Sequence, residues 1–163
     1  MTGLRNLDRE ELFRQAEAIH KGCAEKLNCS ERVFLVMHQL TETDLPAEAV
    51  CMLSGFGGGV GGIRDNICGA VSGGVAAIGL VHGRRKPPEG SKERAYEVSR
   101  EFVARFRTMF ATTLCRELVG DLVREATAEA EERRKARCFR FTLNAIKMCI
   151  DTLQRAERLY PSA

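Results

Sequence analysis

Seven cysteines are the residues of this sequence best suited to chemistry. Because their number is odd, they cannot all pair within one chain. The N-terminal residues are polar where a secretory signal would be apolar, so we expect a cytoplasmic, reducing location in which permanent disulfides are rare. The sequence contains no Cys-x-x-Cys motif, so neither a thioredoxin-like site nor a zinc ribbon is indicated. Such scattered thiols are typical of core packing, metal binding or redox chemistry; they are Cys23, Cys29, Cys51, Cys68, Cys115, Cys138 and Cys149.

Cys68 has the sequence context most favourable to a thiolate. With Asp65 or Asn66 as the N-cap of a helix, Cys68 falls in the first helical turn. Free backbone N–H groups and the helix dipole there favour a negatively charged sulfur. Arg64 would support this charge and Asp65 would oppose it. Cys23 and Cys51 have no such context, and we interpret them as packing thiols.

A glycine-rich run precedes Cys68, and residues 55–62 contain six glycines. Part of the run fits G-x-G-x-x-G, but a dinucleotide site requires a strand before it and an acidic residue about 20 positions later. The preceding segment has a helical pattern and the acidic residue is missing, so we do not expect a nucleotide site. The backbone at Gly57, Gly58 and Gly59 can instead approach a ligand closely, as can Gly69 and Gly73 beside Cys68.

The hydrophobic periodicity is helical almost throughout, and strand-type alternation is nearly absent. It predicts an all-α, single-domain bundle of five to seven helices spanning residues 1–163, with the glycine-rich loop before a buried Gly/Ala-rich helix. Asn6 or Asp8 is the expected cap of the first helix and Ser30 that of the second. One long helix is expected to run from Ser91 to Gly120, with Cys115 near its end. The expected segments are 8–22, 31–40, a short helix from Pro46 to about 54, 67–82, 91–120 and 121 to near 160, with a turn over 41–45.

The composition argues against two classes of partner. The net charge is only +3, from 25 basic and 22 acidic residues, and aromatic residues are few. Nucleic-acid binders usually show a larger basic excess, so we expect no nucleic-acid binding. The longest apolar stretch, residues 67–81, contains four glycines and is shorter than a bilayer span, so we expect no membrane insertion.

The block Cys68-Gly69-Ala70-Val71-Ser72-Gly73, with the glycine-rich residues 54–61 before it and residues 77–84 after it, resembles the C_GCAxxG_C_C family. These are redox-active bacterial and archaeal proteins with a CGAxxG motif and four characteristic cysteines. The similarity covers roughly residues 25–150, although Lys26-Leu27 and His82 depart from the usual pattern. It implies a helical fold, a link to transport proteins, and four functional cysteines. The matching positions are Cys29, Cys68, Cys115 and Cys138, the last favoured over Cys149 by its spacing.

Three hypotheses follow for the function. In the first, Cys29, Cys68, Cys115 and Cys138 bind an iron–sulfur cluster or zinc for electron transfer, and the glycines supply backbone N–H groups. In the second, the protein is metal-free, Cys68 is the attacking thiolate, and another cysteine resolves the disulfide. In the third, the chain is a helical interaction module of a transporter. The first two imply a redox partner protein, and a homo-oligomer is compatible with all three.

Overall fold

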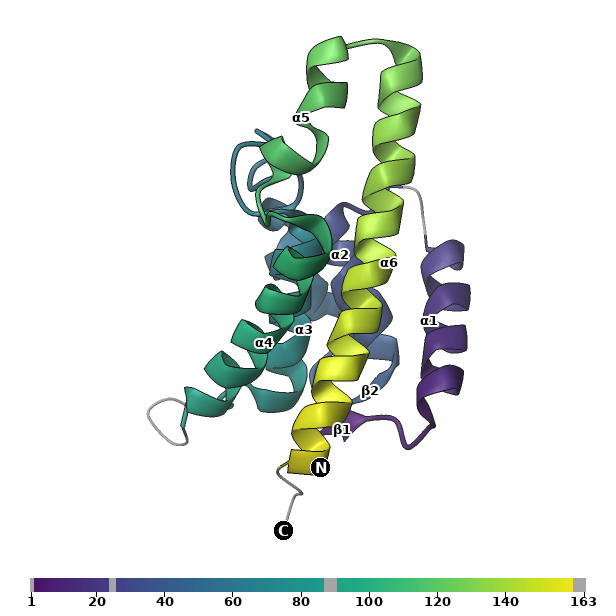
Figure 1. Ribbon diagram of the computed structural model, residues 1–163. Coiled ribbons are helices and arrows are strands. Elements are labelled where there is room, and N and C mark those ends of the chain that lie inside the picture. Colours follow the sequence, from purple (N-terminus) through teal and green to yellow (C-terminus); the bar gives the residue numbers. More distant parts are fainter. Residues whose placement is uncertain (1, 24–25, 87–90, 160–163) are drawn as a thin grey trace.

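The computed structural model describes residues 2–23, 26–86 and 91–159, and it is almost entirely helical (Figure 1). The described residues form six α-helices, one 3-10 helix and one pair of two-residue strands, so the predicted all-α class is confirmed. The helices are α1 (Arg9–Gly22), α2 (Cys29–Gln39), η1 (Ala47–Phe56), α3 (Gly69–His82), α4 (Glu93–Phe110), α5 (Cys115–Glu125) and α6 (Ala128–Leu159), and the antiparallel strands are β1 (Gly3–Leu4) and β2 (Thr41–Glu42).

Helix α6 is the long axis of the molecule. Helices α1, α2, α3 and α4 pack around its C-terminal part, and α5 packs beside its N-terminal part (Figure 1). Ile146 and Ile150 of α6 are fully buried in this core, together with Phe102 of α4. A Cβ at Gly74 of α3 would collide with the ring of Phe102, so the small residues predicted for this segment allow α4 to approach α3.

The first two helices begin at side-chain caps. The carboxylate of Asp8 accepts a hydrogen bond from the backbone N–H of Glu11, which confirms one of the predicted caps. The predicted cap at Ser30 is wrong, because α2 begins at Cys29, two residues before its predicted start. Its cap is Asn28, whose side chain accepts from two backbone N–H groups while Glu31 bonds back to the N–H of Asn28.

The predicted long helix from Ser91 to Gly120 is two helices. Helix α4 ends at Phe110, and Ala111 then has a left-handed backbone with φ of 65°. Helix α5 begins at Cys115, so this cysteine starts a helix and does not lie near the end of one. Gly120, the predicted end or kink, lies inside α5.

Two further predicted boundaries also differ. Helix α3 begins at Gly69 with Cys68 as its N-cap, so the predicted caps Asp65 and Asn66 are wrong and Cys68 lies just before the first turn. The segment after Pro46 is a 3-10 helix, and the predicted turn over 41–45 includes the short strand β2. The predicted helix end near Tyr160 lies outside the described residues. No helix of the described segments is long and apolar enough to span a membrane.

Candidate cysteine centre

Three cysteines mark the N-terminal ends of three helices. Cys29 is the first residue of α2, Cys68 is the N-cap of α3, and Cys115 is the first residue of α5. The N-terminal end of a helix carries backbone N–H groups and a partial positive charge, which favour an electron-rich sulfur. The fourth cysteine, Cys138, lies within α6.

Backbone hydrogen bonds hold the starts of α3 and α5 side by side. The N–H of Cys68 donates to the carbonyl of Thr113 at 2.8 Å, and the N–H of Cys115 donates to the carbonyl of Asn66 at 2.8 Å. Residues Ile67 and Leu114 form an isolated antiparallel bridge between these two segments. The positions of Cys68 and Cys115 are therefore fixed by the backbone.

Two of the predicted glycines lie directly against cysteine side chains. A Cβ at Gly69 would lie 2.8 Å from the Cβ of Cys29. A Cβ at Gly59 would lie 2.9 Å from the Cβ of Cys115, and Gly59 also has a φ of 72°, which side-chain-bearing residues rarely adopt. Both positions require glycine because the loop and the helix ends approach so closely.

Of the other predicted glycines, Gly57 and Gly73 pack against the start of α2, and Gly58 lies in the glycine-rich loop. A Cβ at Gly57 would collide with the side chain of Asn28, the cap of α2. A Cβ at Gly73 would lie 2.6 Å from the carbonyl oxygen of Ser30. Gly58 has a left-handed backbone and accepts a hydrogen bond from the N–H of Arg64 through its carbonyl. These glycines allow the glycine-rich loop and α3 to approach the start of α2, which carries Cys29.

Cys29 and Cys138 are in direct contact. The Cys29 thiol donates a hydrogen bond to the Cys138 sulfur, which lowers the pKa of Cys138 although partial burial opposes this. The same hydrogen bond raises the pKa of Cys29 well above its usual value, and burial raises it further. Negative charge on Cys138, Cys68 or Cys115 would add to this effect on Cys29. The structure thus places all four predicted cysteines within electrostatic range of one another.

Arginine side chains add positive charge beside Cys138. The Nη1 of Arg134 lies 3.9 Å from the Cys138 sulfur and donates to it, which further lowers the pKa of Cys138. Two more hydrogen bonds, at 2.8 and 2.5 Å, join Arg134 to the carboxylate of Glu131 and orient the guanidinium. Arg64 makes a smaller contribution of the same sign to the pKa of Cys138.

Cys68 and Cys115 are more deeply buried than this pair, with exposed fractions of 5% and 7%. Burial raises the pKa of Cys68 to about 12, although the N–H groups of Ala70 and Val71 oppose this change. Burial also raises the pKa of Cys115. The lowered pKa expected for Cys68 from its position at a helix start is therefore not observed, because desolvation outweighs the helix N-terminus.

The remaining cysteines lie in different surroundings. Cys149 is fully buried, its sulfur is 3.7 Å from the carbonyl oxygen of Gly74, and it is not among the groups that act on the cysteine centre. Cys23 is half-buried and packs on the core, as expected for a packing thiol. Cys51 is exposed, so its interpretation as a packing thiol is wrong.

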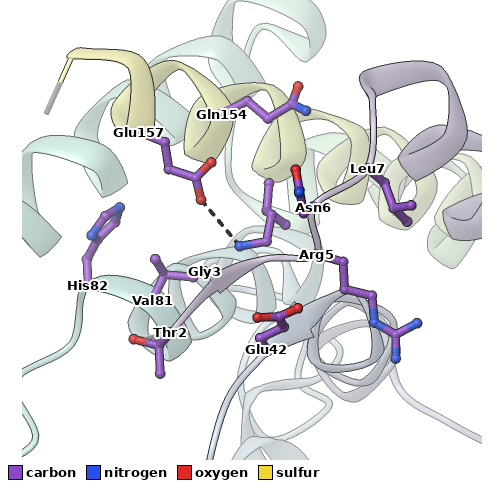
Figure 2. A pocket seen from close by; sticks show the side chains of 11 residues that line it. Thr2, Gly3, Arg5, Asn6, Leu7, Glu42, Val81, His82, Gln154 and Glu157 are labelled. Carbon is purple, nitrogen blue, oxygen red and sulfur yellow. Dashed lines mark hydrogen bonds between the residues drawn. The ribbon is translucent and has the colours of Figure 1, made fainter. Parts of the chain in front are cut away.

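A cavity of about 540 Å³ lies at a different place (Figure 2). It lies between β1 and the C-terminal part of α6, where Glu157 accepts a hydrogen bond from the backbone N–H of Leu4. No cysteine lines it. Gln154, which does line it, lies about 24 Å along α6 from Cys138 at 1.5 Å per residue. The cysteine centre is therefore separate from this cavity.

The sequence model of one protein family, described as "Putative redox-active protein (C_GCAxxG_C_C)", matches residues 27–152. The chain belongs to the C_GCAxxG_C_C family. The match to this family includes all four cysteines of the centre, and the resemblance seen in the sequence is confirmed. In this member the central block reads Cys68-Gly69-Ala70, with the first two residues in the opposite order to that in the family's name. No curated protein and no solved structure matches this member of the family.

Sequence reasoning missed Arg134 and Asn28, and it placed Arg64 beside Cys68 but not beside Cys138. Arg134 precedes Cys138 by one helical turn, so the i,i+4 spacing in α6 is a signal that could have identified it. Asn28 could have been identified as the cap of α2, because Glu31 completes a capping-box pattern with it. Nothing in the sequence places Arg64 near Cys138, because this proximity depends on the path of the glycine-rich loop.

Proposed function

We propose that the chain is a thiol–disulfide redox protein in which Cys138 is the attacking thiolate and Cys29 is its partner. The observation that supports this most strongly is the hydrogen bond from the Cys29 thiol to the Cys138 sulfur. A thiol with a pKa near the ambient pH is the best attacking group in thiol–disulfide exchange. Both residues are partly exposed, whereas Cys68 and Cys115 are buried, so an incoming disulfide can reach the pair more easily.

The proposed reaction consumes a disulfide of a small molecule or a protein. The Cys138 thiolate attacks one sulfur of that disulfide, the S–S bond breaks, and the first thiolate leaves. Cys29 then loses its proton and attacks the Cys138 sulfur, which releases the second thiolate and forms the Cys29–Cys138 disulfide. Two protein thiols are oxidised and one disulfide is reduced to two thiols, with two electrons transferred. The reverse exchange with a thiol returns the protein to its starting state.

A second candidate is a soft-metal centre, either an iron–sulfur cluster or zinc, for electron transfer. The observation that favours it is the proximity of four thiols, the donor set that such centres prefer. Its fit to the structure is incomplete, because no group of three or more His, Cys, Asp or Glu side chains in the described segments is arranged to hold one ion. The four cysteines would have to rearrange around the metal, so we place this candidate second.

The experiment that tests the proposal is oxidation of metal-free protein with a small disulfide, followed by alkylation of the free thiols and peptide mass spectrometry. We expect one internal disulfide, between Cys29 and Cys138, and its loss in Cys138→Ser. Cys51→Ser is the matched control, since this exposed thiol lies outside the centre. Metal and acid-labile sulfide are measured in parallel on protein purified without oxygen. Stoichiometric iron and sulfide, with no Cys29–Cys138 disulfide after oxidation, would contradict the proposal and support the second candidate.

A further inference from the structure

A second, smaller cavity of about 200 Å³ lies beside Arg64. It lies where the segment carrying Arg64 meets the end of α5 and the start of α6. Its wall includes Glu131, the residue that binds Arg134, and Arg134 in turn contacts the Cys138 sulfur. A chain of contacts from Glu131 through Arg134 to the Cys138 sulfur therefore connects the cavity to the centre. The lining residues are Arg64, Leu122, Val123, Ala126, Thr127 and Glu131.

Arg64 is held in this wall by an unusual backbone. Its φ of 59° is left-handed, which costs about 1–2 kcal/mol for a residue with a side chain. The N–H of Arg64 donates to the carbonyl of Gly58 at 2.7 Å, and a Cβ at Gly59 would lie 2.7 Å from the Cα of Arg64. Backbone strain that persists in a fold is often found at functional positions. Here the strained residue faces a cavity.

The guanidinium of Arg64 is available to a ligand. Among the described residues it makes no hydrogen bond or ion pair, although its charge reaches Cys115 and Cys138. Both carboxylate oxygens of Glu131 are already bonded to Arg134, so the cation in the cavity that lacks a bonded partner is Arg64. A free guanidinium in a partly enclosed site favours a carboxylate, which it can bind through two parallel hydrogen bonds.

The remaining walls and the volume restrict the ligand further. Leu122, Val123 and Ala126 are apolar and suit a short aliphatic chain. A volume of about 200 Å³ is below the range of pockets that take drug-sized ligands, so the cavity suits a small molecule and not a folded partner.

We propose that this cavity binds small disulfides that carry a carboxylate, with Arg64 holding the carboxylate and the disulfide sulfur directed to Cys138. The inference rests on the proposed function and names its substrate class. In the step itself, the Cys138 thiolate bonds to one sulfur of the bound disulfide, and the other half leaves as a carboxylate-bearing thiolate. Cys29 then closes the protein disulfide and releases the half held by Arg64.

The test compares three small disulfides of similar length and different charge. These are 3,3′-dithiodipropionate (anionic), bis(2-hydroxyethyl) disulfide (neutral) and cystamine (cationic). The rate of Cys29–Cys138 disulfide formation is measured with each, and the ratio of the anionic rate to the neutral rate is the readout. This ratio is independent of any change in the pKa of Cys138, because both rates depend on the same thiolate. The variant is Arg64→Gln, which keeps a side chain at the strained position.

The matched control is Arg116→Gln, which removes the same charge from α5, where Arg116 pairs with Asp65 outside the cavity. We expect Arg64→Gln to lower the anionic-to-neutral ratio by about fivefold, the upper range for one partly exposed ion pair. Arg116→Gln should leave the ratio unchanged, and cystamine should react more slowly than the neutral disulfide in the unmodified protein.

Three results would overturn the inference, and only the last of them also overturns the proposed function. An unchanged ratio in Arg64→Gln, or an equal fall in Arg116→Gln, would exclude the carboxylate site while the proposed function stands, since the neutral disulfide still oxidises the pair. If the neutral disulfide fails to form the Cys29–Cys138 disulfide in the unmodified protein, the proposed function fails and the substrate inference fails with it.

Discussion

The thiol of Cys29, at the start of α2, donates a hydrogen bond to the sulfur of Cys138 in the long helix α6. The two residues are far apart in the sequence, and the packing of α2 against α6 brings them together. The contact is asymmetric, because it raises the pKa of Cys29 and lowers that of Cys138. This asymmetry supports the different roles that the proposed exchange gives to the two thiols.

The first prediction concerns the pH dependence of Cys138. Its rate of alkylation by iodoacetamide, followed by peptide mass spectrometry, should be half-maximal at a lower pH than that of an ordinary cysteine, because the thiolate is the reacting form and the pKa of Cys138 is lowered. Cys29→Ala removes the hydrogen-bond donor and should move this midpoint to higher pH. Cys29→Ser keeps a hydroxyl donor, so its shift should be smaller. A midpoint that is the same in all three proteins would contradict the assigned hydrogen bond.

The second prediction concerns Arg134. Arg134→Met keeps an extended side chain but removes the charge and the donor to the Cys138 sulfur, so the pKa of Cys138 should rise. Arg133→Met is the control, because Arg133 is exposed and pairs with Glu125. The same alkylation profile measures both. If the two variants shift the midpoint equally, the effect is a general loss of positive charge and not the contact with Cys138.

The third prediction concerns the glycines. Gly59→Ala should lower the free energy of unfolding by about 2–4 kcal/mol, because its left-handed φ and its contacts with Arg64 and Cys115 leave no room for a methyl group. Gly79→Ala is the matched control, since Gly79 lies within α3 with nothing within 4 Å of an added Cβ. It should raise the free energy of unfolding by up to about 1 kcal/mol. Urea denaturation measures both, and a neutral Gly59→Ala would contradict the described packing.

The fourth prediction concerns His20, which is fully buried with its Nε2 2.7 Å from the hydroxyl of Thr142. Burial, with a smaller effect of Arg32, lowers the pKa of His20 to about 4, below the unfolded value of 6.5. Between these values the unfolded chain binds the proton more readily, so stability is lost as the pH falls from 6.5 to 4. The loss attributable to this group is at most about 3 kcal/mol.

The measurement for His20 is urea unfolding at pH 7 and pH 4.5. We expect His20→Gln to be less stable than the unmodified protein at pH 7 and to lose less stability at pH 4.5. His82→Gln is the control, because His82 also has a lowered pKa and its removal leaves the contribution of His20 intact. An equal loss in His20→Gln and the unmodified protein would show that His20 does not titrate in this range.

Local sequence signals predicted the helices well and their ends less well. The apolar spacing of residues 8–22 and the cap at Asp8 agree with α1, because both depend on neighbouring residues. The break between α4 and α5 was missed because it occurs at Ala111, a strong helix former that has a left-handed backbone here. The hydrogen bonds that pair the starts of α3 and α5 accompany this break, and they are tertiary contacts.

In the candidate site too, features set by neighbouring residues were predicted and features set by tertiary contacts were not. The cysteine block and the glycines were recognisable as a motif, and the structure places them together. The choice of Cys68 as the most acidic thiol did not agree with the structure, because a helix N-terminus is visible in a sequence and the burial that opposes it is not. The pairing of Cys29 with Cys138 depends on how α2 docks on α6, so it had no local signal.

The distribution of the four cysteines over α2, α3, α5 and α6 has a consequence for the synthesis of the protein. Cys138 receives its hydrogen bond from Cys29 only when α2 has docked on α6, which requires most of the chain to be made. In a nascent or unfolded chain, each thiol is solvated and titrates at an ordinary pH. The lowered pKa of Cys138 is thus a property of the assembled fold, which arises only once α2 and α6 have docked.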